Sequence, residues 1–185
     1  MSPVADSGAN FELPEDLQNT VNFHGHLCPG VLIGYRASKE ALKRLESKRS
    51  EDEELVAVVE NDSCAVDAVQ FLTGATFGKG NFVFRDYGKQ VFTFMLRPSG
   101  KGLRLALKAG ALGSGDISRE EKARLLMSRP IVDLFDIKEG DMELPPEAEI
   151  RKSVVCDSCG EPVMDSRTRD IGGKLLCIPC AEKRT

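Results

Sequence analysis

The sequence has little histidine, no long hydrophobic run and no excess of basic residues. Only two of the 185 residues are histidine, and the formal net charge is -4. Apolar stretches stay well short of the roughly 20 residues that a membrane-spanning helix needs, and residues 1–10 lack the basic and apolar regions of a signal peptide. A negative net charge gives no overall field that attracts nucleic acid. We therefore expect a cytoplasmic protein with no membrane partner, for which nucleic acid is a disfavoured partner.

The six cysteines fall into two groups, and this division predicts two domains. Cys28 and Cys64 lie in the first half of the chain, whereas the other four lie in the last thirty residues. Thiols stay reduced in the cytoplasm, so clustered cysteines there indicate metal sites and not disulfides. A diproline at positions 145 and 146 marks a linker. We predict a core domain of residues 1–147 and a small domain of residues 148–185.

Apolar spacing in the first 147 residues predicts an α+β fold in which an antiparallel sheet packs against helices. The expected helices are residues 11–22, 30–48, 64–72 and 118–128, and the expected strands are residues 55–59, 81–85, 90–97 and 103–107. The run 55–59 is continuously apolar, which is typical of a central strand covered on both faces. The last three strands are expected to form an antiparallel meander. Residues 131–135 are expected to be a last core strand or an apolar tether.

The C-terminal cysteines form two CxxC pairs, and their spacing indicates a structural zinc site. The first pair is Cys156 and Cys159, the second is Cys177 and Cys180, and seventeen residues separate the pairs. Four thiolates at this spacing are typical of closed tetrahedral Zn²⁺ sites. A knuckle, a hairpin turning at residues 172–173 and a short terminal helix would resemble a treble-clef finger. A domain this small cannot hold a core without its metal.

The function of this finger has two interpretations. Its basic residues permit contact with nucleic acid; they are Arg167, Arg169, Lys174, Lys183 and Arg184. The simpler interpretation, and the one we favour, is a structural or docking module that contacts protein. One alternative function for the whole chain is therefore a regulatory or binding module whose finger contacts a protein partner or nucleic acid.

Both histidines lie in one short segment with a cysteine, as His24-x-His26-x-Cys28. In an extended segment alternate side chains point the same way, so all three could face one ion. Imidazole and thiolate together suit zinc, nickel, copper or iron. Cys28 precedes a helix that starts at Pro29, and Cys64 is expected in the first turn of another helix. Amide donors and the helix dipole favour thiolate at both positions, so the two cysteines and two histidines would form a four-ligand site.

Three interpretations of this segment remain open. In the first, a metal ion is bound by some of the four residues. In the second, Cys28 or Cys64 is the nucleophile of a metal-independent thiol enzyme, with His24 or His26 as its base. In the third, the histidines are hydrogen-bonded structural residues and the cysteines are buried apolar ones.

Several segments resemble the FmdE family, which is named for a component of formylmethanofuran dehydrogenase. The matching segments are FHGHLCPG at 23–30, IGYRA at 33–37, NDSCAVDAVQ at 61–70, TFGKGN at 76–81 and DYGK at 86–89. The resemblance covers about residues 17–140, and the four-cysteine finger is similar to an appendage found in many members. It implies a usually dimeric α+β core with a metal site near the His/Cys segment. It also implies a link to the molybdenum or tungsten enzyme of methanogenesis, which reduces carbon dioxide and attaches it to methanofuran as a formyl group.

On the matching positions, the resemblance points to His24, His26, Cys28 and Cys64 as the site. The implied cofactors are zinc in the finger and a second transition metal, zinc or nickel, at this core site. His26 and the two cysteines are the candidate catalytic residues of an enzyme-like, oxidoreductase-associated factor. The chain lacks an iron–sulfur pattern of closely spaced cysteines beyond the finger pairs. We therefore expect an accessory factor of one-carbon or redox metabolism, with other subunits of the dehydrogenase as partners.

Three further residues are implicated near this site. Asp62 and Asp67 could orient a histidine, because metal-bound imidazoles donate their second N–H to a carboxylate or carbonyl. Lys79 lies between two glycines that let a ligand approach the backbone, so it is expected to bind an anionic group.

Overall fold

The computed structural model describes residues 13–113 and 116–183. They form two compact units, one ending at Glu147 and one beginning at Ala148, and each is described by itself. Within the described ranges, no helix combines the length and apolarity required to cross a membrane. The expected helix start at residues 11 and 12 and the basic Arg184 of the finger lie outside the described residues.

In the described part of this unit, four helices occur where the apolar spacing predicts them, and a fifth short helix lies where a strand or a tether was expected. Their bounds are Glu15–His24 (α1), Pro29–Arg44 (α2), Ala65–Thr73 (α3), Arg119–Ser128 (α4) and Ile131–Leu134 (α5). The second helix ends four residues before its expected end, because Glu46 turns left-handed (φ 51°) and the Ser47 N–H bonds back to the Leu42 carbonyl at 2.9 Å. The Ser118 hydroxyl caps α4 by accepting from the Glu121 N–H at 3.1 Å, as its capping-box pattern predicts.

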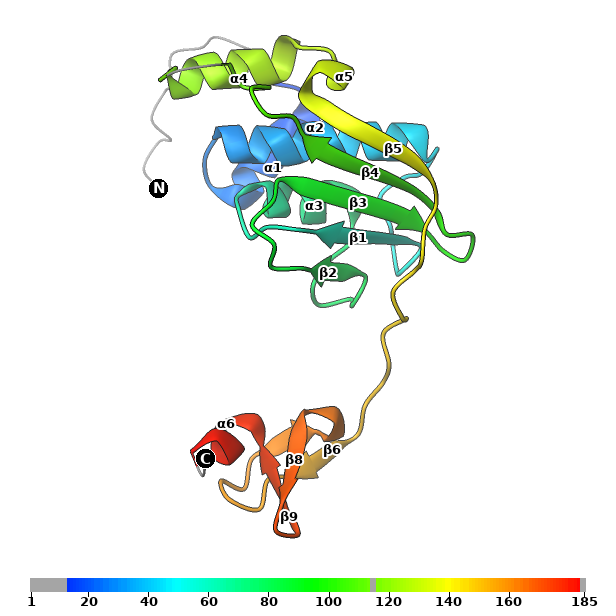
Figure 1. The fold of residues 1–185 in the computed structure, drawn as a ribbon, viewed down its shortest axis with the longest axis vertical. Coiled ribbons are helices and arrows are strands. Elements are labelled where there is room, and N and C mark those ends of the chain that lie inside the picture. The colour runs from blue at the N-terminus through cyan, green and yellow to red at the C-terminus, as the bar shows by residue number, and fades with distance from the viewer. Residues whose placement is uncertain (1–12, 114–115, 184–185) are drawn as a thin grey trace. The chain divides into compact units, whose positions relative to one another are not determined.

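One five-stranded sheet forms the centre of the first unit (Figure 1). Its strands are Leu55–Val59 (β1), Phe82–Phe84 (β2), Val91–Leu96 (β3), Lys101–Leu107 (β4) and Phe135–Asp141 (β5). Their spatial order is β2-β1-β3-β4-β5. Every residue of β1 is buried, which confirms it as a central strand. The α+β fold class, with a largely antiparallel sheet packed against helices, is confirmed.

Two details of the predicted sheet are wrong. β2 does not pair with β3 in a meander but runs parallel to β1, with Ala57 opposite Phe82. Parallel strands need a long crossover, and α3 supplies it between β1 and β2. Residues 131–134 form a helical turn, and the last strand, β5, follows it. β5 was not predicted, because it is an edge strand with charged residues along most of its length. Charged residues on an edge strand hinder its pairing with other chains.

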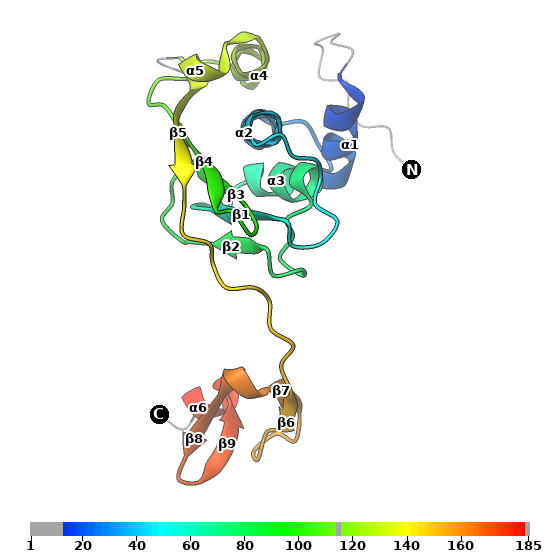
Figure 2. The same cartoon turned by 90° about the vertical axis from the view of Figure 1, so that its right-hand side faces the viewer.

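Helices α2 and α3 cover one face of the sheet, and α1 packs against these two helices (Figure 2). The core between them includes Leu17, Val21, Leu32, Val69, Phe92, Phe94, Leu103 and Leu105. On the other face, Val56, Val58 and Met95 are covered in part by Met142 and Leu144, which follow β5. The end of α1 and the starts of α2 and α3 carry the predicted His/Cys residues, so the helix layer positions the core site.

The second unit is a finger built from two short hairpins and a terminal helix. Its elements are Ser153–Val155 (β6), Pro162–Met164 (β7), Asp165–Arg167 (η1), Thr168–Ile171 (β8), Lys174–Cys177 (β9) and Ile178–Glu182 (α6). β6 pairs with β7, and β8 pairs with β9 across a turn at Gly172 and Gly173. Both glycines have left-handed backbones (φ 63° and 75°), which explains their use in this tight turn. The predicted treble-clef elements are thus confirmed.

Candidate metal centres

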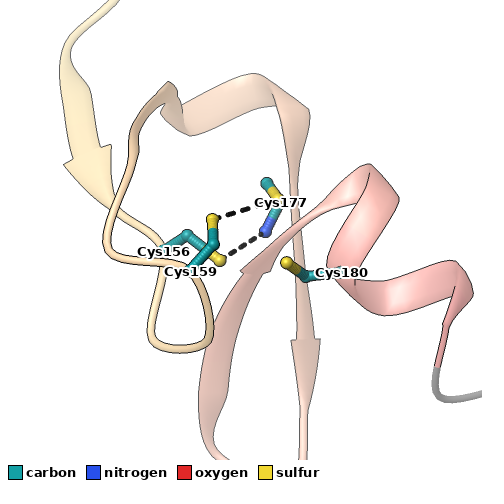
Figure 3. Close-up of side chains that lie close together, drawn as sticks. All are labelled: Cys156, Cys159, Cys177 and Cys180. Carbon is teal, nitrogen blue, oxygen red and sulfur yellow. Dashed lines mark hydrogen bonds between the residues drawn. The ribbon is translucent and has the colours of Figure 1, made fainter.

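The four finger cysteines converge on one point (Figure 3). Their sulfur atoms all lie within 4.8 Å of one another. Cys156 and Cys159 come from the knuckle after β6, Cys177 ends β9 and Cys180 lies in α6. Sulfur atoms about 2.3 Å from a tetrahedral zinc ion lie about 3.8 Å apart, and Cys159 Sγ is 3.9 Å from Cys177 Sγ. The arrangement fits a structural Zn²⁺ ion.

The finger backbone also favours the thiolate that zinc requires. The Cys177 N–H donates to Cys156 Sγ at 3.3 Å, a bond drawn in Figure 3. Backbone donors from Cys159, Cys177 and Ser158, in that order of importance, lower the pKa of Cys156 to about 6. Amide donors that stabilise sulfur charge are expected of a metal knuckle. The predicted Cys₄ site is therefore assembled by both side chains and backbone.

In the core unit, His24 and Cys28 are positioned by two helix ends. His24 is the last residue of α1, and Gly25 ends that helix in a left-handed conformation (φ 101°). Cys28 is the N-cap of α2, and its sulfur accepts from the Val31 N–H at 3.5 Å. The expectation of one extended segment is therefore wrong at its first residue. Convergence arises from the turn between two helices and not from alternation along a strand.

A carboxylate orients His24. Its Nδ1 lies 2.7 Å from Asp67 Oδ2, and its Nε2 lies 4.0 Å from Cys28 Sγ. A carboxylate accepts, so Nδ1 carries the hydrogen and Nε2 directs its lone pair toward the cysteine. The His24 side chain is only 11% exposed, whereas that of Asp67 is 39% exposed, so the bond is shielded from water mainly on the imidazole side. The expectation that Asp67 orients a histidine matches this contact.

His26 completes a cluster of three metal-binding side chains. Its ring centroid lies 4.6 Å from that of His24, with 40° between the rings. One ligand atom from each of His24, His26 and Cys28 lies within 4.8 Å of the others. Nitrogen and sulfur ligands of a tetrahedral zinc ion are about 3.3–3.8 Å apart, so a shift of about 1 Å would bring this set to coordination distance. The donor chemistry therefore fits a transition metal.

Cys64 lies close to Cys28 because two glycines let α2 approach α3. A Cβ atom added at Gly30 would lie 2.9 Å from Cys64 Cβ and 3.7 Å from Cys28 Sγ. At Gly34 it would lie 2.1 Å from the Ala65 carbonyl oxygen. Only glycine permits this approach. The role of these glycines was missed, although their spacing of four on one helix face was visible in the sequence.

The pKa of the Cys64 thiol is raised, opposite to the lowering expected of a helix start. Burial raises the pKa of the Cys64 thiol, and the hydrogen bond with Cys28 raises it further. Desolvation of a charged sulfur thus outweighs the favourable helix start. Cys64 also falls outside the group of ligand atoms that lie within 4.8 Å of one another. Its coordination of a metal stays a prediction.

A cavity of about 470 Å³ opens beside the core cluster. Its lining comprises His24, Val59, Asn61, Asp62, Ser63, Cys64, Val66, Asp67, Gln70, Phe77, Phe82 and Phe84. The volume is in the range of small-molecule sites. A ligand there would lie directly against the His24–Asp67 pair and Cys64.

Lys79 and Asp62, which the sequence implicated near the site, lie in different surroundings. The Lys79 ammonium donates to the backbone carbonyls of residues 50, 51 and 52, at 3.1, 3.2 and 3.2 Å. These bonds use its three donors and hold that loop, so its predicted binding of an anion stays untested. Asp62 lines the cavity, and its orientation of a histidine likewise stays a prediction.

Comparison with known proteins gives two family matches. The family described as "FmdE, Molybdenum formylmethanofuran dehydrogenase operon" matches residues 23–141. The family described as "Prokaryotic dksA/traR C4-type zinc finger" matches residues 150–185. The first match contains the whole core cluster, and the second contains all four finger cysteines.

Two individual proteins are also similar. A "Probable S-adenosyl-L-methionine-binding protein" of Archaeoglobus fulgidus is 29% identical over 199 residues, which cover 86% of this chain and 50% of the relative. The chain thus spans about half the length of that relative. A crystal structure of a tungsten formylmethanofuran dehydrogenase FmdE-like protein from Syntrophus aciditrophicus is 25% identical, with a TM-score of 0.69 and 91% of each chain covered.

Proposed function

The chain belongs to the FmdE family, and from this membership we propose that it is a metal-dependent factor of one-carbon or redox metabolism. In this proposal the core unit binds zinc or nickel through His24, His26 and Cys28, with Cys64 as a candidate fourth donor. The finger binds a separate structural zinc ion. The similarity to an FmdE-like protein over 91% of the chain supports the proposal.

The observation that carries the core metal is the hydrogen bond between His24 and Asp67. At 2.7 Å it occupies Nδ1 and leaves Nε2 for an ion on the Cys28 side. Carboxylate–histidine pairs of this kind orient metal ligands and raise their basicity. A bound ion with an open position would polarise a substrate or water. An open position requires that Cys64 does not coordinate the ion, and Cys64 is then the candidate to exchange protons or act as nucleophile beside it.

The proposed partners follow from the family and are separate from the metal. We propose a homodimer that works with other subunits of a molybdenum- or tungsten-dependent formyl dehydrogenase, and a docking role for the finger. Copurification of tagged chain from its native cells, followed by mass spectrometry, tests these partners. Recovery of the chain alone, and a monomer in sedimentation experiments, would contradict them.

Elemental analysis tests the core metal. Protein purified without added metal should contain two equivalents, one from each centre. His26→Ala and Cys28→Ser should each remove one equivalent and leave the finger zinc, whereas the matched change Cys159→Ser should remove the other. Unchanged metal content in both core variants would refute the core site.

A second candidate function is the binding of S-adenosyl-L-methionine. The relative from Archaeoglobus fulgidus carries this name, and the cavity beside His24 has room for a ligand of that size class. Titration calorimetry with S-adenosylmethionine tests it directly. Heat of binding that disappears in Phe82→Ala would support this function, and no binding at millimolar ligand would refute it.

A further inference from the structure

Three aromatic side chains line the cavity beside the core cluster. Phe77, Phe82 and Phe84 line it together with Val59 and Val66. Phe82 is buried, at 7% exposed, whereas Phe77 and Phe84 are 75% and 43% exposed. Single exposed apolar side chains need no explanation, but several on one hollow form a surface that a ligand can cover.

The segments that carry these three aromatic side chains are held in place. The Phe77 N–H donates to Gln70 Oε1 at 3.1 Å, so a helix residue that itself lines the cavity fixes the backbone of Phe77. Asn81 anchors the same loop, because its side-chain oxygen accepts from the Thr76 N–H at 3.0 Å. Phe77 therefore lies on a braced loop, and Phe82 and Phe84 lie on β2, which is paired with β1. This order reduces the entropic cost of binding.

The charge of the cavity is negative. Asp62 and Asp67 line it, and none of its described lining residues is lysine or arginine. A divalent ion at the cluster would be balanced by the Cys28 thiolate and by Asp67, which is bonded to His24. Asp62 would remain unpaired, since this exposed residue makes no hydrogen bond or ion pair with another described side chain or backbone group.

We propose that this cavity binds a small organic ammonium cation with an aromatic or apolar body. Aromatic faces attract cations through the ring quadrupole, and the exposed Asp62 carboxylate in the lining adds attraction. The same carboxylates repel anions. The inference rests on the proposed function and deepens it, because it names the ligand class of the same site.

Three probes of one shape class test the proposal: benzyltrimethylammonium, benzyl alcohol and benzoate. Their dissociation constants are measured by NMR saturation transfer on the full chain, with metal content determined on the same samples. We expect the cation to bind about 10-fold more tightly than the alcohol, the size of a partly desolvated cation–π interaction. Equal binding of cation and alcohol, or tighter binding of benzoate, would overturn the proposal.

Matched variants locate the effect. Asp62→Asn should weaken binding of the cation about 3–5-fold and leave that of the alcohol unchanged, whereas Asp86→Asn, an exposed carboxylate that does not line the cavity, should change neither. Phe77→Leu keeps apolar bulk and removes the ring, so it should weaken cation binding about 3–5-fold. Phe23→Leu is its control, since Phe23 is 57% exposed but packs on Phe71 outside the cavity.

The proposed metal site and the proposed cation site can be refuted separately. If the purified protein contains no core metal but still prefers the cation, the missing metal overturns the proposed function and this inference stands. A full metal equivalent with no cation preference would overturn the inference alone. Loss of affinity in Phe23→Leu equal to that in Phe77→Leu would also overturn it, since the effect would not come from the cavity.

Discussion

Replacement of Gly34 by alanine should push α2 and α3 apart. An added Cβ would lie 2.1 Å from the Ala65 carbonyl oxygen and 2.9 Å from the Ala65 Cα. These are backbone atoms, so no side-chain rotation relieves the clash. The helices must separate, and the separation acts on the site because α2 begins beside Cys28 and α3 begins beside Cys64.

The expected loss of stability is about 2 kcal/mol. Overpacking of a core costs about 1–3 kcal/mol, and a clash with backbone places this change at the upper end. The higher helix propensity of alanine offsets about 1 kcal/mol of this loss. For a core unit of this size, a loss of about 2 kcal/mol lowers the Tm by about 6 °C.

Thermal unfolding followed by circular dichroism, with the finger kept in zinc, measures this loss. Gly78→Ala is the matched control, because an added Cβ there meets no atom within 4 Å and its backbone is not left-handed, so its effect should stay within about 0.5 kcal/mol. A Tm of Gly34→Ala within about 1 °C of wild type would refute the close-approach argument.

Three further predictions address the two centres and the packing of α1. Removal of zinc with a chelator should collapse the NMR dispersion of residues 150–183, because so small a unit depends on its metal; retained dispersion would contradict this. Asp67→Asn should weaken core metal binding about 10–100-fold in chelator competition, whereas Asp62→Asn, which makes no bond to His24, should not; equal effects would deny Asp67 its orienting role. Asp16→Asn should cost about 1 kcal/mol in urea unfolding at pH 7, since the Asp16 carboxylate accepts from Tyr35 at 3.0 Å and from Lys39 at 2.6 Å. Burial acts to raise the pKa of Asp16, but these hydrogen bonds outweigh it and the pKa is lowered. The advantage of wild type over Asp16→Asn is therefore full above about pH 4 and should vanish as the pH falls through the lowered pKa; a difference independent of pH would exclude the carboxylate charge as its cause.

Local sequence patterns predicted most elements of the fold. The apolar run 55–59, the capping box at Ser118 and the two CxxC pairs each specify their structure through neighbours a few residues away. The pairing of the strands depends on residues far apart in the sequence, so local patterns could not predict it. That β2 lies beside β1 depends on the crossover through α3, and β5 is a strand only because β4 offers it an edge.

The core site shows the same division. The sequence by itself identified His24, His26 and Cys28 as potential ligands, because residue type and clustering determine which chemistry is available. Only the tertiary structure decided how they converge, since the left-handed Gly25 turns α1 into α2 and Asp67, 43 residues away, selects the free nitrogen of His24. Burial of Cys64 likewise depends on helix packing, and it raises the thiol pKa that a helix start was expected to lower. Ligand identity is a property of single residues, whereas ligand geometry and desolvation are properties of the packed fold.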